Sequence, residues 1–154
     1  VERFVPPNKG PRHVLRLLRD ILAFDPKKRG TNLGAALDYL DQIGMENVSR
    51  HEHDLLVYGT RGLLSVPGLR IIGTAVEKAG VLSFVLDGFR SEDVGQALDR
   101  EGIAVRAGHH CAQPILRRFG LESTVRPSLA VYNIREDLDA LVAALLRIQA
   151  GRGY

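Results

Sequence analysis

Apolar residues recur along the chain at two different spacings, and each spacing predicts one kind of element. Spacings of three and four residues place apolar side chains on one face of an α-helix, whereas short, nearly continuous apolar runs are typical of buried strands. The helical spacing predicts helices over residues 12–24, 33–43, 48–64, 91–100, 115–119 and 134–150. The short runs predict strands over residues 69–73, 81–86, 103–105 and 125–132.

Residues at the ends of these segments support the predicted boundaries. Glycines are expected to end three of the helices, at Gly44, Gly102 and Gly120. Polar side chains are expected to cap helix starts at Asn47, Ser91 and Asn133, the last with Glu136 completing a capping box. Pro127 lies inside the last predicted strand, and proline cannot donate to a ladder, so this strand is expected at a sheet edge or a bulge.

The order of these elements predicts the fold class. Helices come first, and strands and helices then follow as β-β-α-β-α-β-α. We expect an α/β (α+β) domain in which helices pack on a small mixed sheet of about four short strands. No glycine-rich phosphate loop, neither G-x-x-x-x-G-K-[ST] nor G-x-G-x-x-G, opens any predicted helix, so a nucleotide-binding domain is not expected.

Composition and charge indicate which kinds of protein are not expected. Of the 154 residues, 45% are hydrophobic and 25% are charged, as in an ordinary globular domain. The formal net charge is +3 and no basic stripe alternates with aromatic residues, so no nucleic-acid partner is expected. No apolar run is long enough to span a membrane. A single cysteine fits a reducing compartment, so a cytoplasmic location is predicted, and the start at Val1 predicts a piece of something longer.

The segment 106–114, Arg-Ala-Gly-His-His-Cys-Ala-Gln-Pro, concentrates the candidate chemistry because it holds the only cysteine, Cys111. Gly108 allows the backbone to turn, and a proline at position 114 favours the start of a helix. His109 and His110 directly precede the cysteine, and cationic neighbours favour the reactive thiolate. These features predict an exposed loop that carries a nucleophilic sulfur.

Other interpretations of the same residues remain open at this point. Cys111 can be a small buried hydrophobe, as most lone cysteines are. The His-His-Cys run supplies zinc-ligand types without the usual ligand spacing, and a Cys-His hydrolase would need a base and an orienting group that the sequence does not single out. Arg106 and Arg126 can be carboxylate-binding residues or members of ordinary ion pairs.

The two segments 106–114 and 126–133, the latter Arg-Pro-Ser-Leu-Ala-Val-Tyr-Asn, strongly resemble the C-terminal part of group II (SUF-type) cysteine desulfurases. These enzymes are related to selenocysteine lyases and belong to the class V aminotransferases. The resemblance implies that residues 32–150 form the small domain of a fold-type I pyridoxal-phosphate enzyme. Residues 1–31 would then be a divergent N-terminal extension with one helix, and residues 151–154 a tail.

The resemblance also implies a reaction and assigns residues to it. In the family, pyridoxal phosphate (PLP) binds L-cysteine, a loop cysteine takes its sulfur as a persulfide, and alanine leaves. On this chain Cys111 matches the persulfide carrier, Arg126 the residue that binds the substrate carboxylate, and Arg106 a second active-site arginine. Gly108, His109 and His110 match the residues that shape the loop. A SUF-type sulfur-acceptor protein, iron–sulfur cluster assembly and a homodimer are implied in the same way.

The cofactor-binding part of the family pattern has no counterpart in the sequence. The Schiff-base lysine of the family follows a histidine, and none of the upstream lysines, Lys9, Lys27 and Lys28, does so. We therefore expect no cofactor-binding residue and no desulfurase activity in this chain alone. The chain can be an enzyme part that works with a separate large domain, or a persulfide carrier or dimerisation module without catalysis.

Overall fold

The computed structural model describes residue 34 and residues 37–151, and it divides the chain into two units, Val1–Glu52 and His53–Tyr154. The helix predicted over residues 12–24 lies outside the described residues. In the first unit, residues 37–43 are helical and end at Gly44, as predicted, with φ +84° and its amide donating to the Leu40 carbonyl at 2.9 Å. Helix α3 (Met45–Leu64) follows at once.

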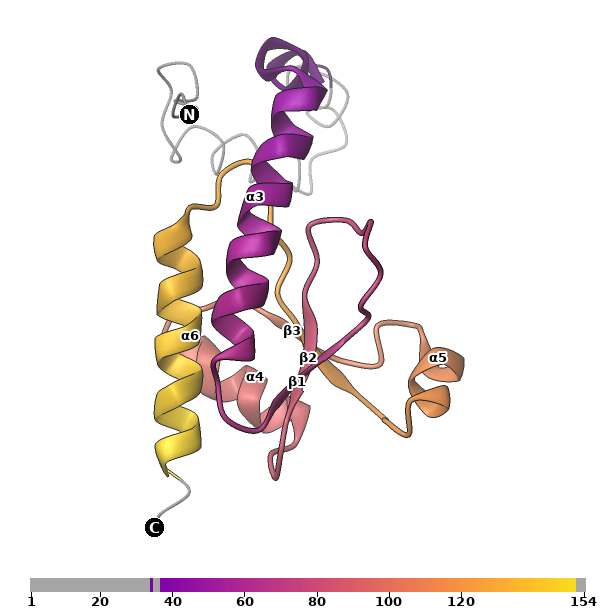
Figure 1. Cartoon of the computed structure of the whole chain (residues 1–154), viewed down its shortest axis with the longest axis vertical. Coiled ribbons are helices and arrows are strands. Elements are labelled where there is room, and N and C mark those ends of the chain that lie inside the picture. Colours follow the sequence, from indigo (N-terminus) through magenta and orange to yellow (C-terminus); the bar gives the residue numbers. More distant parts are fainter. Residues whose placement is uncertain (1–33, 35–36, 152–154) are drawn as a thin grey trace. The chain divides into compact units, whose positions relative to one another are not determined.

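Four short strands form the sheet of the second unit, which confirms the predicted fold class. They are β1 (Leu69–Ile72), β2 (Ser83–Leu86), β3 (Arg106–Gly108) and β4 (Thr124–Arg126), in the spatial order β1-β2-β4-β3 (Figure 1). Every neighbouring pair is antiparallel, so the sheet is not mixed as predicted. The connection from β2 to β4 passes through α4, β3 and α5, and it brings these two strands together antiparallel.

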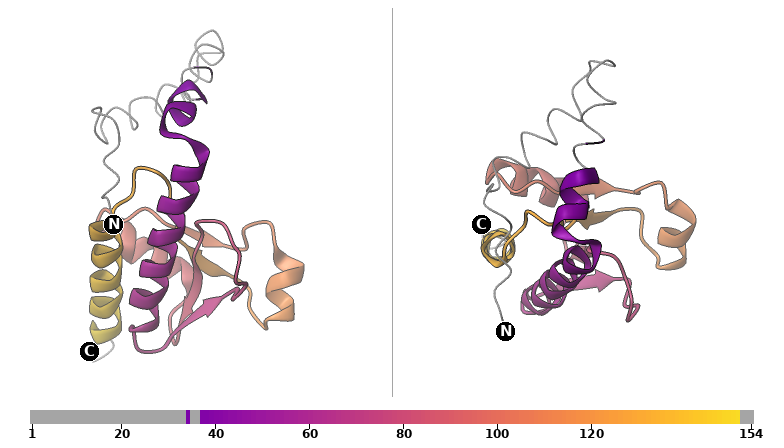
Figure 2. Two further views of the ribbon diagram at one scale, coloured as in Figure 1. Left: turned by 45° about the horizontal axis from the view of Figure 1, so that its top comes forward. Right: turned by 90° about the horizontal axis from the view of Figure 1, so that it is seen from above.

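Helices cover one face of this sheet and build the core there. Alternate strand residues point to this face, and the register pairs Ile71 with Phe84 and Phe84 with Val125. Helices α4 (Ser91–Arg100), α6 (Arg135–Ala150) and the second-unit part of α3 supply the opposing side chains. Figure 2 shows the ribbons of these helices beside the strands. The fully buried members of the core, at 0% exposure, are Leu63, Leu82, Phe84, Leu98, Val125, Ala144 and Leu145.

The same alternation turns the neighbours of Val125 to the other face of the sheet. Val125 pairs with Ala107, whose side chain lies against Gly95 of α4, so this pair belongs to the helix side. Thr124 and Arg126, one residue to either side, therefore stand on the opposite face together with Arg106. The packing of apolar side chains thus determines where the candidate site residues project.

Two predicted strands have different bounds in the structure. Residues 103–105 have no strand partner; the Ile103 amide donates instead to the Leu98 carbonyl at 3.0 Å, which closes the end of α4. Strand β3 begins three residues later than predicted. Strand β4 is interior to the sheet and ends before Pro127, whose carbonyl accepts from the Leu82 amide at 3.1 Å. The edge position inferred from this proline was wrong, because the strand stops one residue short of it.

The helix starts also differ by one to three residues from the predicted caps. Asn47 lies inside α3, and its amide side chain donates to the Ile43 carbonyl at 2.8 Å. Ser91 is the first residue of α4 rather than its cap. At α6 the carboxylate of Asp137, not Glu136, accepts from the Ile134 amide at 3.1 Å, while the Asn133 side chain accepts from the Ala130 amide. Short polar side chains next to a helix start can serve either turn or cap.

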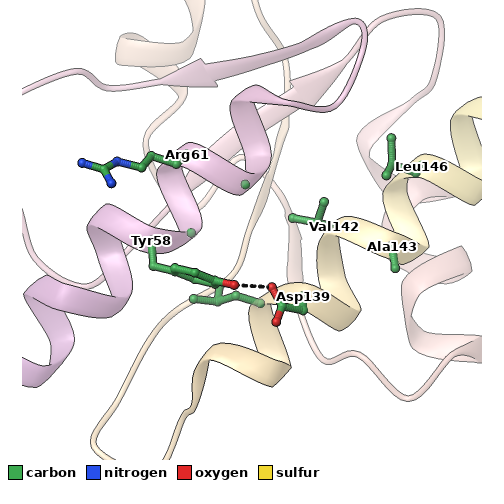
Figure 3. A pocket seen from close by; sticks show the side chains of 9 residues that line it. Tyr58, Arg61, Asp139, Val142, Ala143 and Leu146 are labelled. Atoms are coloured by element: carbon green, nitrogen blue, oxygen red, sulfur yellow. Dashed lines mark hydrogen bonds between the residues drawn. The ribbon is translucent and has the colours of Figure 1, made fainter. Parts of the chain in front are cut away.

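Helices α3 and α6 approach closely where α3 has glycines. A Cβ on Gly59 would lie 2.9 Å from Leu138 Cδ2, and one on Gly62 would lie 3.0 Å from Val142 Cγ2. Beside this contact the Tyr58 hydroxyl donates to the Asp139 carboxylate at 2.6 Å, at the rim of a pocket between the two helices (Figure 3). The glycines, which weaken helices intrinsically, are therefore used here for close packing. None of the helices in the described part of the chain is long and apolar enough to cross a membrane.

Replacing Gly59 by alanine is expected to lower the free energy of unfolding by about 1 kcal/mol. The methyl group would crowd buried Leu138 and Leu82, a cost of about 1–3 kcal/mol that exceeds the gain of about 1 kcal/mol in helix propensity. Urea unfolding measures this change. Gly34→Ala is the matched control, because nothing lies within 4 Å of the added Cβ, and it should be neutral or stabilising. An unchanged or raised stability in Gly59→Ala would contradict the close approach.

Candidate functional site

The predicted cysteine loop connects β3 to helix α5 (Gln113–Arg118) and turns sharply. Gly108 has φ +135°, a value that suits glycine, as the sequence predicted. His110 and Cys111 follow with φ of 55° and 59°, the only non-glycine residues with positive φ in the described part of the chain. The Ala112 amide donates to the His109 carbonyl at 2.9 Å and closes the turn. The thiol of Cys111 is exposed, which contradicts the reading of this cysteine as a buried hydrophobe.

The side chain of His110 ties the loop to strand β4. Its Nε2 lies 3.0 Å from the Thr124 carbonyl oxygen and 3.0 Å from the Thr124 hydroxyl. Thr124 is only 1% exposed and lies opposite Gly108 in the strand register. A carbonyl oxygen can only accept, so a hydrogen on Nε2 would be donated to it, whereas the hydroxyl could also donate to an unprotonated Nε2. Thr124 could not be predicted as part of the site, because threonine is common in strands and nothing in the local pattern marks it.

Burial lowers the pKa of His110 below the ordinary histidine value. The hydrogen bond with Thr124 acts in the opposite direction and raises it, whereas the charges of Arg126, Arg106 and His109 lower it further. The neutral imidazole is therefore favoured at neutral pH. Its Nδ1 is buried and has no hydrogen-bond partner, which also disfavours a second proton.

Arg106 and Arg126 stand directly opposite each other in the β3–β4 register. Like charges at opposed positions of an antiparallel pair repel, so this arrangement is costly unless an anion compensates it. Neither arginine is in an ion pair among the described residues, and the Arg126 Nε is buried without a hydrogen-bond partner. The ordinary ion-pair interpretation therefore fails for the described part of the chain. The geometry presents two guanidinium groups on one face, a suitable receptor for a carboxylate.

His109 points to a different neighbourhood from His110. It is exposed, and its charge contributes to lowering the pKa of Glu92 on α4. The main cause of that lowering is the hydrogen bond of Glu92 with its own backbone amide, followed by one from the Ser123 side chain. The two adjacent histidines thus diverge, as expected for neighbouring residues in a loop. Among the described residues no group of three or more His, Cys, Asp and Glu side chains could hold a metal ion.

The described residues do not fit pyridoxal phosphate. Protein sites hold this cofactor through an imine to a lysine and through groups that partner its pyridine nitrogen. Lys78 is the only lysine in the described part of the chain, and its Nζ donates to the Gly73 carbonyl at 3.3 Å in the β1–β2 connection. The pocket between α3 and α6 in Figure 3 is lined by none of the loop residues and by neither Arg106 nor Arg126. The described residues thus show no cradle for this cofactor.

Comparison with known families identifies the class of protein. The family model described as "Aminotransferase class-V" matches residues 30–141. A second model, described as "Protein of unknown function DUF58", matches residues 1–52. The first match covers more than half of the chain, so this protein belongs to the class V aminotransferase family.

Within that family the relatives are cysteine desulfurases. A cysteine desulfurase of Synechococcus elongatus is 68% identical over 119 residues, which cover 77% of this chain and 19% of that protein. A probable cysteine desulfurase of Mycobacterium leprae is 56% identical over 119 residues, which cover 77% of this chain and 20% of that protein. The chain thus corresponds to a cysteine desulfurase segment that spans about a fifth of the length of these relatives.

Solved structures show the same arrangement. The apo cysteine desulfurase of Thermococcus onnurineus superposes with a TM-score of 0.77 at 32% identity, covering 84% of this chain and 32% of that one. The cysteine desulfurase CsdA of Escherichia coli, in an S-sulfonic acid form, gives 0.73 at 33% identity, covering 83% and 32%. A C-DES mutant with glycine covalently linked to its PLP cofactor has a TM-score of 0.66 at 22% identity and shares the fold.

Replacing Cys111 by glycine is expected to give a more stable protein than replacing it by alanine. The left-handed backbone at φ 59° costs a residue with a Cβ about 1 kcal/mol more than glycine. Chemical unfolding of the two variants should differ by about that amount. At the next residue, Ala112 with φ −120°, the change to glycine should instead destabilise. An alanine variant more stable than the glycine variant at position 111 would show that the turn has another conformation.

Acid is expected to weaken the loop through His110. Its pKa is lower in the folded than in the unfolded chain, so the unfolded state gains a proton first as pH falls. The contribution of His110 to the free energy of unfolding is therefore complete above the ordinary pKa of about 6.5, and it is lost as the pH falls toward the lowered pKa. NMR titration of the imidazole measures this pKa, and His110→Gln should remove that part of the pH dependence. A His110 pKa at or above the ordinary value would contradict the described environment.

Proposed function

We propose that this chain is the C-terminal small domain of a cysteine desulfurase, in which Cys111 receives the sulfur of L-cysteine as a persulfide. The observation that carries the proposal is the exposed Cys111 thiol on a turn bound to Thr124, two residues along β4 from Arg126. A nucleophile and a carboxylate receptor are thus carried by adjoining parts of one scaffold. Such positioning is what a sulfur transfer between a small amino acid and a protein thiol requires.

Each predicted site residue has a role in this proposal. Arg126 binds the carboxylate of L-cysteine through its guanidinium group, and Arg106 adds a second positive charge on the same face. Gly108, His109 and His110 shape the loop. The buried, unpartnered Arg126 Nε supports the first assignment, because an unpaired polar group of this kind is available to a ligand.

The sulfur transfer itself needs only one group of this chain. The Cys111 thiolate attacks the sulfur, an S–S bond forms, and the bond from that sulfur to its former carbon breaks. The electron pair of the broken bond stays on the carbon, which takes up a proton and leaves as part of alanine. PLP supplies the stabilisation of that carbon in intact enzymes of the family, and the described residues hold no group for it.

The persulfide would serve iron–sulfur cluster assembly through a SUF-type acceptor protein in the cytoplasm. A homodimer and a separate or appended large domain complete the proposed enzyme. The relatives support the separate or appended large domain, because this chain spans only 19% and 20% of the length of two of them. L-Cysteine as substrate is supported by the names of the same relatives.

A second candidate is a persulfide carrier or dimerisation module without catalysis. The absence of a cofactor cradle among the described residues favours it, because Cys111 can accept sulfur from another enzyme without any cofactor of its own. The two candidates share Cys111 and differ in whether a PLP-binding domain restores release of alanine. Sulfur acceptance is therefore the property to test first.

Cys111 is expected to acquire one sulfur atom when the chain is incubated with L-cysteine and a PLP-loaded cysteine desulfurase. Alkylation followed by peptide mass spectrometry locates the added sulfur, and Cys111→Ser should abolish it because a hydroxyl cannot carry a persulfide. The chain alone, mixed with PLP and L-cysteine, should release no alanine. If adding a lysine-bearing large domain restores alanine release, the chain is part of an enzyme. If Cys111 accepts sulfur but alanine release is not restored, the result supports a persulfide carrier. Sulfur transfer that survives Cys111→Ser would sink both candidates.

A further inference from the structure

The geometry points to His110 as a positioning residue, which fixes the Cys111 thiol relative to Arg126 by donating its Nε2 hydrogen to the Thr124 carbonyl. This inference rests on the proposed function for the meaning of Cys111 and Arg126. It names the partner residue Thr124, the donor atom Nε2 and the tautomer of His110, none of which follows from a role in loop shape alone. The partner residue, Thr124, lies outside the segment that carries the cysteine.

The first argument comes from the backbone of the turn. Two consecutive non-glycine residues, His110 and Cys111, are held at φ 55° and 59°. Each such residue is disfavoured and persists only where its surroundings fix it. The turn has one internal hydrogen bond, from the Ala112 amide to the His109 carbonyl at 2.9 Å. Among the described residues, the side chain of His110 links this turn to the sheet through its contact with Thr124.

The second argument comes from the strand that receives this contact. Thr124 is 1% exposed, lies in β4 and pairs with Gly108, so its carbonyl has little freedom to move. Arg126 lies two residues further along the same strand and on the same face as Thr124. A side chain that binds Thr124 therefore fixes the position of the neighbouring Cys111 relative to β4, the strand that also carries Arg126. The Cys111 thiol and the Arg126 guanidinium group are then both held in place by this strand.

The third argument identifies the tautomer. With hydrogen on Nε2, the ring donates to the Thr124 carbonyl and leaves a lone pair on the buried Nδ1. With hydrogen on Nδ1, the Thr124 hydroxyl could donate to Nε2, but the Nε2 lone pair would also face the carbonyl oxygen and the buried Nδ1 donor would have no acceptor. A ring with hydrogen on both nitrogens would also leave the buried Nδ1 donor without an acceptor. Its charge would in addition be repelled by the positive groups that face it, Arg126 on β4, Arg106 on β3 and His109 in the loop. The geometry therefore selects the neutral Nε2–H form.

Sulfur transfer from two small persulfides tests the positioning role. Cysteine persulfide carries a carboxylate for Arg126, and cysteamine persulfide lacks one. In both reactions the Cys111 thiolate attacks the outer sulfur, a new S–S bond forms, the S–S bond of the donor breaks, and the donor thiolate leaves with the electron pair. The intact chain should react about tenfold faster with the carboxylate donor, the ratio that one well-placed charged hydrogen bond provides.

The variants separate positioning from general stability. His110→Ala should bring the rate ratio of the two donors to about one, because the thiol loses its fixed place relative to Arg126. His110→Gln should restore the ratio, because its side-chain amide can also donate to the Thr124 carbonyl. His53→Ala, which removes an exposed histidine of α3, is the matched control and should keep the ratio of the unaltered chain. A ratio unchanged in His110→Ala would overturn the inference.

NMR of the same full-length proteins gives a readout that does not depend on the proposed function. The imidazole nitrogen signals should show hydrogen on Nε2, and the amide–Hα coupling of Cys111 should change in His110→Ala and not in His53→Ala. If the unaltered chain shows no donor preference or accepts no sulfur, the roles of Arg126 and Cys111 fail, and NMR alone decides on His110. A Cys111 coupling unchanged in His110→Ala, or hydrogen on Nδ1, would then overturn the inference.

Discussion

The arrangement of the site depends on the register of β3 against β4. Pairing Ala107 with Val125 directs those two side chains toward the helices and turns Arg106, Thr124 and Arg126 to the opposite face. Val125 is completely buried and Ala107 lies against Gly95 of α4, so a slip of one residue would place charged groups in the core. The hydrophobic core therefore enforces the facing position of two arginines that would otherwise repel. An anion on that face stabilises the same register that the core already requires.

This division between the two faces explains why the site is open while the scaffold is rigid. Three helices cover one face and bury its apolar side chains, and the other face carries Arg106, Thr124 and Arg126. The loop with Cys111 leaves β3 at its end and returns through α5 to β4, so both of its anchors lie in the same hairpin. In the proposed function the strands orient a small substrate, while the exposed thiol can meet a donor or acceptor of sulfur.

Much of the fold could be predicted from the sequence, because strong periodicity and glycine stops determine its helices and strands. The bounds of α4 and the helix ends at Gly44, Gly102 and Gly120 follow from local residues alone. The strands were harder, since β3 becomes a strand only through its partner β4, and residues 103–105 look equally apolar. For the site, the local cluster predicted the exposed thiol, but not the contact between His110 and Thr124. That contact joins residues 14 positions apart and exists only after the hairpin forms.

The energetics of the turn explain why its residues are not simply glycines. Left-handed conformations cost His110 and Cys111 about 1–2 kcal/mol each, and two glycines would avoid this cost. Both side chains are nevertheless needed in the proposed function, one as nucleophile and one as anchor. A hydrogen bond contributes about 1 kcal/mol net, so the anchor at Thr124 and the turn-closing bond from Ala112 together offset most of the cost without exceeding it. A turn so balanced gives the thiol a defined place and leaves it exposed. The proposed function requires both properties, because the same sulfur atom must meet a donor and an acceptor in succession.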